Sequence, residues 1–299
     1  MNLYTQKDSN TRKTWFLIAL FLILTIGIGW VFSYAFGTPL ILYIAVFISI
    51  LMSFLSYWHS DKIVLAMTHA KLINHRDNLE LYRIVENLCI AAGLPTPKIY
   101  IISTPALNAF ATGRNPKHAV VAVTEGLLSR LDRSELEGVI AHELSHIGNR
   151  DMLVSTVVVV LVGFIVILSD FFVRWSFFGG RSNKRENGNA AAVMMIIGIF
   201  LAILAPIMAK LIQLAVSRKR EFLADASGAL LTRYPEGLAS ALEKIGRDET
   251  PMRHAGHAVA HLFIASPFKG EERTSWFTRL FMTHPLISER IKVLRELKI

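Results

Sequence analysis

One stretch of the sequence, from Ser134 to Asp151 (SELEGVIAHELSHIGNRD), contains side chains that could hold a catalytic metal ion. Its central residues, His142 to His146, read HELSH and have the H-E-x-x-H pattern. Residues four apart lie on one face of a helix, so the two imidazoles can converge on one ion. Glu143 lies beside that face, where its carboxylate can reach a water molecule bound to the ion. The same spacing also fits an amphipathic helix whose histidines bond only to protein neighbours.

The residues around the two histidines have the features of a helix. Ser134 and Glu137 form a predicted capping box at its start. Apolar side chains then recur at helical spacing and supply a stripe that can pack on a core: Leu136, Val139, Ile140, Leu144 and Ile147.

A catalytic zinc site needs three protein ligands and an open position for water. The best candidate for the third ligand is Glu221, in the run REFLAD that ends at Asp225. Taken alone, a glutamate after three basic residues is usually a solvated ion-pair partner. Taken with HELSH, the run closely resembles the gluzincin pattern, in which E-x-x-x-D follows on a second helix. The resemblance implies that Glu221 completes the metal site and that Asp225 supports a ligand histidine. The two carboxylates share a helix face, which suits these roles.

The composition indicates a membrane protein. Hydrophobic residues make up 53% of the 299 residues and charged residues only 18%, a balance that points to membrane spans. The formal net charge of +9 fits lysines and arginines that flank these spans and contact anionic lipid headgroups. Nucleic-acid binding would need basic residues interleaved with aromatic ones, and the sequence has no such stretch, so no nucleic-acid partner is expected. The single cysteine, Cys89, excludes an internal disulfide framework.

A transmembrane hairpin is predicted over residues 1–60. No Asp, Glu, Lys or Arg occurs from Thr14 to Ser60. Turn residues at Gly37, Thr38 and Pro39 divide this run into two segments of about twenty residues, each long enough to cross a hydrocarbon core about 30 Å thick. A cleaved signal peptide is the alternative for the first segment, but the charged amino-terminal arm is long and no small-x-small cleavage site follows a short apolar run.

A second hairpin is predicted over residues 152–216. Apolar runs at 152–169 and 190–209 are joined by the polar loop 179–189 (GGRSNKRENGN). Asp170 and Lys210 shorten both runs, and buried core helices would have a similar composition. Two apolar runs joined by such a loop nevertheless favour a hairpin, which brings the expected number of transmembrane helices to four.

The positive charges predict the orientation in the membrane. With four spans, the amino terminus and both soluble segments lie on one side, where lysines and arginines near the spans outnumber those of the second loop. Because cytoplasmic loops carry the excess of Lys and Arg, the soluble segments are expected to face the cytoplasm. The second loop opposes this orientation, and its charges would also fit a hairpin that does not cross fully: Arg174, Arg181, Lys184 and Arg185.

The soluble segments, 61–151 and 217–299, are predicted to form the two parts of one α+β catalytic domain. A small sheet followed by a metal-binding helix is an α+β pattern. Before Ser134 we expect helices at Asn78–Ala92 and Glu125–Leu131, and strands at Lys98–Ile102, Ala106–Thr112 and His118–Val123. After the second hairpin we expect helices from Arg218 past Asp225, at Ala239–Ile245 and at Ile287–Leu297, with Arg247–Ser275 irregular.

The order of these features resembles the HtpX family of bacterial membrane zinc endopeptidases over nearly the whole chain. The order is hairpin, small sheet, H-E-x-x-H, hairpin, E-x-x-x-D and a late His-Pro. The resemblance implies a zincin-like domain on four transmembrane helices, with one Zn²⁺ per chain held by His142, His146 and Glu221, and with Glu143 as general base. It also implies an ATP-independent protease of the inner membrane that cuts misfolded or damaged membrane proteins. The more distant CAAX prenyl endopeptidases have more spans than this chain can supply.

Two further sites follow from the resemblance. The family's late His-Pro and Arg, thought to stabilise the tetrahedral oxyanion, match His284, Pro285 and Arg290. The alternative interpretation is that His284 caps the following helix and that Arg290 is a surface cation. The family's edge-strand motif, whose backbone would pair with a substrate strand, matches Asn108, Ala109, Phe110 and Ala111. An ordinary strand with a buried Phe110 fits the same residues.

A further group of histidines, His254, His257 and His261, has helical spacings of three and four. Gly256 weakens that helix and no carboxylate completes a metal site, so we expect a mobile segment that covers the cleft rather than a second site. Histidines at these spacings by chance are the base case. The metal itself should lie near the membrane surface, because His146 is only about 9 Å along a helix from the apolar run at Met152. Substrates would then be loops or termini of proteins near the bilayer.

Two other classes of protein share some of these features. A catalytically silent membrane scaffold could keep the fold, but it would have no need of Glu143. A channel or transporter would need polar or ionisable groups inside its spans, and the first hairpin has no charged residue between Thr14 and Ser60.

Overall fold

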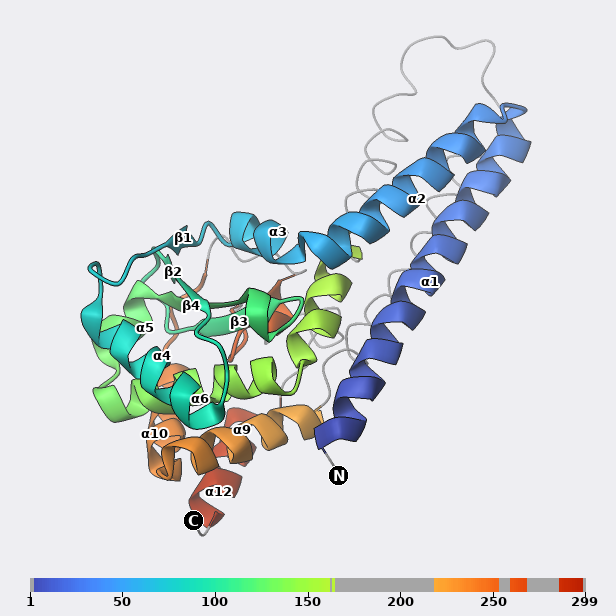
Figure 1. Ribbon diagram of the computed structural model, residues 1–299. Helices are drawn as coiled ribbons and strands as arrows, with labels where there is room; N and C mark the ends of the chain where they lie inside the picture. Colours follow the sequence, from blue (N-terminus) through green and yellow to red (C-terminus); the bar gives the residue numbers. More distant parts are fainter. Residues whose placement is uncertain (1–2, 162, 165–217, 253–258, 268–284, 298–299) are drawn as a thin grey trace.

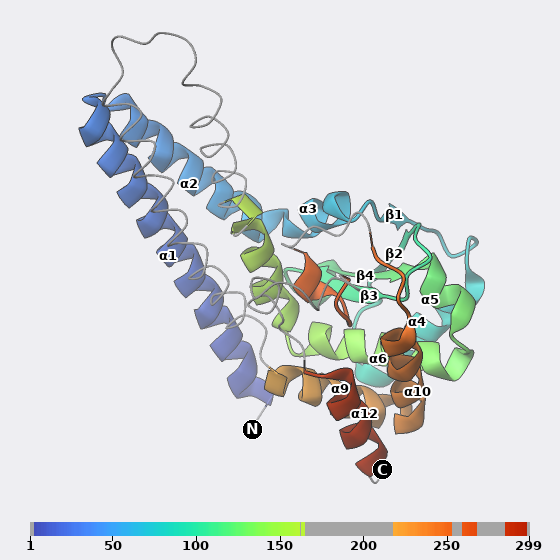
Figure 2. The same ribbon diagram turned by 180° about the vertical axis from the view of Figure 1, so that it is seen from behind.

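The computed structural model describes residues 3–161, 163–164, 218–252, 259–267 and 285–297. Two long helices, α1 (Leu3–Phe36) and α2 (Leu40–Trp58), project as a hairpin from the part of the molecule that holds the sheet. The turn between them lies at the far end of the hairpin, and both views show the start of α1 beside α9 (Figures 1 and 2). Gly37 closes α1 with a φ of +63°, a left-handed conformation that glycine adopts without steric cost.

The hairpin matches the first pair of predicted spans. Two segments, Ser9–Val31 and Leu40–Trp58, are long and apolar enough to cross a membrane. The helices pack closely where Gly29 meets Ala45, and a Cβ atom added to Gly29 would collide with the Ala45 side chain. Small residues of this kind let membrane helices approach. The second predicted hairpin falls mostly within residues 165–217, outside the described residues, so four spans remain a prediction.

A four-stranded sheet lies beside the hairpin, with the order β1-β2-β4-β3. Its strands are β1 (Lys71–Leu72), β2 (Lys98–Ile102), β3 (Ala109–Gly113) and β4 (Ala119–Thr124). β2 and β4 are parallel, whereas β1 with β2 and β3 with β4 are antiparallel. The predicted strand Lys98–Ile102 is therefore confirmed, and the other two predicted strands begin one to three residues later than expected.

Both faces of the sheet are covered. Successive side chains of a strand point to opposite faces, and each face packs against its own core. Val121 and Val123 face a core shared with helices α4 (Leu79–Ala92) and α6 (Arg133–Gly148). Phe110 and Val120 face a second core, which includes residues of α3 (Ser60–Met67) and of the apolar helix Asp151–Leu161. Cys89 lies buried in the first core. The remaining described helices are α5 (Glu125–Arg130), α9 (Arg218–Thr232), α10 (Pro235–Arg247) and α12 (Ile287–Glu296), with the 3₁₀ turns η1 (Pro116–His118) and η3 (Ala260–Leu262).

The start of α6 differs from the prediction. Asp132, not Ser134, is the N-cap: its carboxylate accepts the Glu135 N–H at 2.9 Å, and Glu135 accepts the Asp132 N–H at 2.8 Å. The predicted capping pair Ser134 and Glu137 is wrong, because both pairs satisfy the same spacing rule and the chain uses the earlier one. Glu135 also binds Lys244 of α10 at 2.6 Å, so this cap ties α6 to its neighbour. The helix α10 is longer than predicted and passes through Gly246, where we expected its end.

The contact between α6 and α9 depends on Gly228. A Cβ atom added there would lie 3.0 Å from the backbone N of His142 and 3.2 Å from its Cα. The absence of a side chain at Gly228 therefore lets α9 lie directly against the turn of α6 that carries the first histidine.

The capping assignment predicts that Asp132→Ala destabilises the protein more than Ser134→Ala. Loss of an N-cap carboxylate costs about 1 kcal/mol, whereas the Ser134 hydroxyl bonds only to the Asp132 carboxylate among the contacts described here. Urea unfolding of the detergent-solubilised chain measures both changes. A larger loss for Ser134→Ala would show that the cap is misassigned.

The close approach at Gly228 predicts that Gly228→Val separates α9 from α6 and costs about 1–3 kcal/mol, the usual penalty for overpacking. Gly148→Val is the matched control on α6, since a Cβ atom there meets only the flexible end of Leu94, at 3.8 Å. Thermal unfolding of both variants compares them. Equal stability losses would mean that Gly228 is not needed for the packing of these helices.

Candidate metal centre

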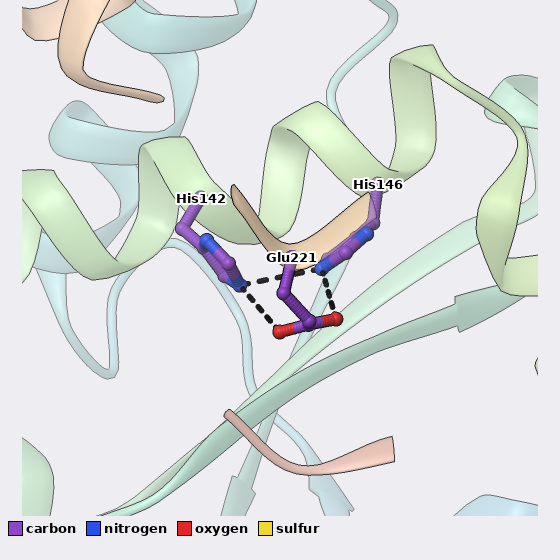
Figure 3. Close-up of side chains that lie close together, drawn as sticks. All are labelled: His142, His146 and Glu221. Carbon is purple, nitrogen blue, oxygen red and sulfur yellow. Dashed lines mark hydrogen bonds and ion pairs between the residues drawn. The ribbon is translucent and has the colours of Figure 1, made fainter. Parts of the chain in front are cut away.

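The two histidines of α6 and one glutamate of α9 point towards a common position (Figure 3). The Nε2 atoms of His142 and His146 are 3.2 Å apart. The Glu221 carboxylate completes the group, with Oε2 3.8 Å from His142 Nε2 and Oε1 3.6 Å from His146 Nε2. The chain thus brings together the three residues that the sequence suggested as metal ligands.

These separations fit one tetrahedral metal ion. With metal–ligand distances near 2.0–2.1 Å, neighbouring tetrahedral ligands lie about 3.3 Å apart. The ligand type fits as well, because two imidazoles and a carboxylate form the His₂Glu set of some catalytic zinc sites. The residues present can therefore hold a divalent cation such as zinc.

His142 is oriented by a buried ion pair. Its Nδ1 lies 2.9 Å from Asp225 Oδ1. Arg290 of α12 donates to the same carboxylate twice, from Nε at 2.8 Å and from Nη2 at 2.7 Å. Burial acts to raise the pKa of the Asp225 carboxyl, but Arg290 and His142 outweigh it and hold that pKa well below its usual range. Asp225 therefore stays ionised and fixes the ring with Nε2 towards the centre.

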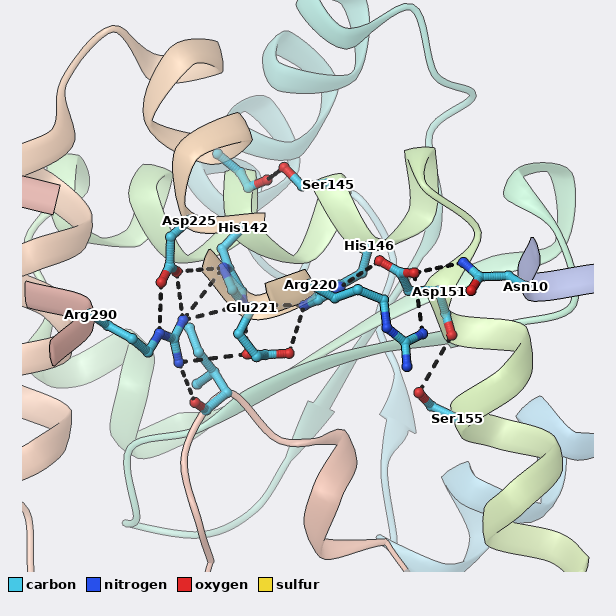
Figure 4. A network of polar contacts seen from close by, with 12 residues as sticks. Asn10, His142, Ser145, His146, Asp151, Ser155, Arg220, Glu221, Asp225 and Arg290 are labelled. Carbon is cyan, nitrogen blue, oxygen red and sulfur yellow. Dashed lines mark hydrogen bonds and ion pairs between the residues drawn. The ribbon is translucent and has the colours of Figure 1, made fainter. Parts of the chain in front are cut away.

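His146 has a similar partner, which the sequence analysis did not assign. Its Nδ1 lies 3.5 Å from Asp151 Oδ2 (Figure 4). Asp151 also accepts from Asn10 of α1 at 2.7 Å and from Arg220 of α9 at 3.3 Å. Burial acts to lower the pKa of His146, but Asp151 and Glu221 raise it to about 9. The sequence signal for this contact is an acidic residue five positions after His146, but that spacing alone does not identify Asp151 as its partner.

Glu143 lies inside the protein beside the sheet. The residue is 2% exposed, and the backbone of Ala111 in β3 hydrogen-bonds to its side chain. Burial raises the pKa of Glu143 to about 7, against the opposing effect of His146. Glu143 and the three candidate ligands line one cavity. The general-base candidate thus lies next to the edge strand on which a substrate was expected.

The strand predicted to bind substrate, β3, lies on the outer edge of the sheet, but other residues of the chain cover part of it. The Ala109 carbonyl accepts the Ile264 N–H at 2.9 Å. Asn108 precedes β3 and donates from Nδ2 to the Ala265 carbonyl at 2.9 Å. The Phe110 side chain is buried and packs edge-on against Phe263, at 5.1 Å between ring centroids. A substrate strand that approached this edge would therefore meet Ala111 beside Glu143, whereas the Ala109 carbonyl is already hydrogen-bonded to Ile264.

The other sequence candidates fall in different places. Arg290 is fully buried, so the surface-cation alternative is wrong. Three candidates lie outside the described residues: His254, His257 and His284. His261, the remaining member of the histidine group, lines the cavity and lies with Nε2 3.3 Å from the Ser155 carbonyl.

Comparison with known proteins is consistent with this geometry. Residues 75–298 match the model of peptidase family M48. A protease HtpX homologue of Caldanaerobacter subterraneus is 46% identical over 301 residues, covering 99% of this chain and 98% of the relative. One from Pyrococcus furiosus is 47% identical over 288 residues, covering 95% of each. The crystal structure of S. mikatae Ste24p shares the fold, with a TM-score of 0.51 and 19% identity over 97% of this chain and 67% of that one.

The family match covers most of the chain, and it includes both histidines of α6 and the carboxylates of α9. The relatives are similar from end to end, which includes the apolar helices α1 and α2. The chain belongs to peptidase family M48 and is a membrane metalloprotease of the HtpX type.

Proposed function

We propose that the chain is a zinc-dependent endopeptidase of the bacterial inner membrane that cuts misfolded or damaged membrane proteins from the cytoplasmic side. The observation that carries this proposal is the convergence of two imidazoles and a carboxylate beside a buried glutamate and a sheet edge. His142, His146 and Glu221 would hold the ion, one per chain. Zinc bound there would act as a Lewis acid and lower the pKa of a coordinated water.

Glu143 has the position and the environment of a general base. It takes the proton of the attacking water and returns it to the leaving amine, a role that is efficient when the pKa lies near the working pH. Burial raises its pKa to about 7, and a bound cation nearby would lower it. The Ala111 N–H holds the carboxylate at the edge of β3, so a substrate strand paired along this edge would bring its peptide bond to the same place.

For Arg290 and His284 we propose support of the negatively charged tetrahedral stage. Arg290 uses two of its donors on Asp225, and its Nη1 lies 3.8 Å from Glu221 Oε2. Its contribution would therefore come mainly through the orientation of His142 and through its positive charge. His284, which lies outside the described residues, would supply a second donor.

The hairpin supports a membrane-proximal substrate. Asn10 lies at the start of the apolar segment Ser9–Val31 and binds Asp151, which in turn contacts His146. The candidate metal centre is thus two contacts from the end of a candidate span. Loops or termini at the bilayer surface are the proposed substrates, on the side that the lysines and arginines assign to the cytoplasm.

The direct test is Glu143→Gln in the purified, zinc-loaded chain. Removal of a general base typically lowers the rate by about 10²–10⁴-fold, so cleavage of casein should fall at least a hundredfold while zinc content stays unchanged. Cleavage is measured with and without a chelator, and zinc by elemental analysis.

Glu137→Gln is the matched control, since Glu137 lies on the same helix and pairs only with Arg133 among the described contacts. It should retain full activity. Zinc binding without chelator-sensitive cleavage in the parent chain would support the silent membrane scaffold, and undiminished cleavage by Glu143→Gln would remove Glu143 from the mechanism.

A further inference from the structure

We propose that Asp151 is a positioning residue for His146, and that Asn10 of helix α1 holds Asp151 in place. The first membrane helix would then be part of the support of the metal centre. This inference rests on the proposed metal site and goes beyond it, because it assigns roles to two residues that are not ligands.

Asp151 lies where three helices meet (Figure 4). One carboxylate oxygen, Oδ2, faces His146 Nδ1 at 3.5 Å. The other, Oδ1, accepts from Asn10 Nδ2 at 2.7 Å and from Arg220 Nη1 at 3.3 Å. Asp151 and Asn10 are each only 4% exposed. These contacts fix the carboxylate from α1 and α9 and leave one oxygen directed at the imidazole.

The contacts around His146 have the same pattern as the contacts around His142. His142 is bound by Asp225, which is bound by the buried Arg290. His146 is bound by Asp151, which is bound by the buried Arg220. A carboxylate on the remote nitrogen fixes the orientation of a metal-binding imidazole and strengthens it as a ligand. Asp225 would therefore orient the His142 ring, and Asp151 would orient the His146 ring in the same way.

The backbone is bent in a way that brings Asp151 to this position. In a continuous helix a residue five places after His146 would lie about 140° around the axis from it. Instead α6 ends at Gly148, and Arg150 adopts a φ of +56°, a left-handed conformation that costs a non-glycine residue about 1–2 kcal/mol. The reversal at Arg150 turns the Asp151 side chain back towards His146.

Asn10 stabilises this turn as well as the carboxylate. Its Nδ2 also lies 3.4 Å from the Asn149 carbonyl, so one amide group contacts both the end of α6 and Asp151. Asn10 belongs to the apolar segment Ser9–Val31, where a buried amide has little reason to occur unless it is hydrogen-bonded. A displacement of α1 against α6 would therefore change the position of His146.

The test compares Asp151→Asn and Asn10→Leu in the full detergent-solubilised chain, both in a Glu143→Gln background to prevent self-cleavage. Zinc affinity is measured by competition with a chelator, and the ligand geometry by the visible spectrum of the cobalt(II) form. Loss of such a partner typically weakens metal binding about 10–100-fold. We expect that loss for Asp151→Asn, a smaller loss for Asn10→Leu, and an altered cobalt spectrum in both.

Thr14→Val is the matched control, because Thr14 is buried one turn further along α1 and its hydroxyl bonds only to the Asn10 carbonyl in the described part of the chain. It should leave affinity and spectrum unchanged. Asn10→Leu tests the proposal on its own if Asp151→Asn fails to fold. Parental affinity and spectrum in the variants would overturn the inference while the metal site stands, whereas a parent chain without zinc binding would overturn the proposed function and this inference together.

Discussion

The two histidines of α6 both present Nε2 to one position, and this arrangement organises the structure around the centre. The remote nitrogens face Asp225 and Asp151, which come from different parts of the chain. Because Glu221 and Asp225 lie four residues apart on α9, one helix contact places both a candidate ligand and the support of another. That contact is close enough to require glycine at position 228. The chemistry of the site therefore depends on the packing of α6 against α9.

The centre concentrates buried charge. Four acidic residues (Glu143, Asp151, Glu221 and Asp225) and two arginines (Arg220 and Arg290) are each at most 9% exposed as whole residues. With these six groups ionised and both histidines neutral, as metal binding requires, two negative charges are left over, which is the charge that one divalent cation neutralises. An excess of buried negative charge is costly, so this region is suited to a bound cation. Burial is also the main reason that the pKa of Glu143 rises to about 7, and the neighbouring Glu221 carboxylate adds to the rise.

Local patterns predicted much of the fold and the candidate ligands. The helix α4 begins after Asn78, whose side chain accepts the Leu81 N–H, and ends at Gly93 with a φ of +64°, as the residue types indicate. HELSH and E-x-x-x-D led to the three residues that converge. The sequence does not identify the cap of α6, because Asp132 with Glu135 and Ser134 with Glu137 both have the spacing of a capping box. The pairing of Ile264 with Ala109 and the burial of Arg290 link residues far apart in sequence, and no local pattern encodes such contacts.

X-ray absorption at the zinc edge of the purified chain tests most directly whether the two imidazoles and Glu221 hold one ion. The account predicts one zinc per chain with nitrogen and oxygen ligands at about 2.0–2.2 Å and the outer scattering of two imidazoles, with the carboxylate contribution lost in Glu221→Gln. A spectrum with fewer than two imidazoles, or one that Glu221→Gln leaves unchanged, would contradict it.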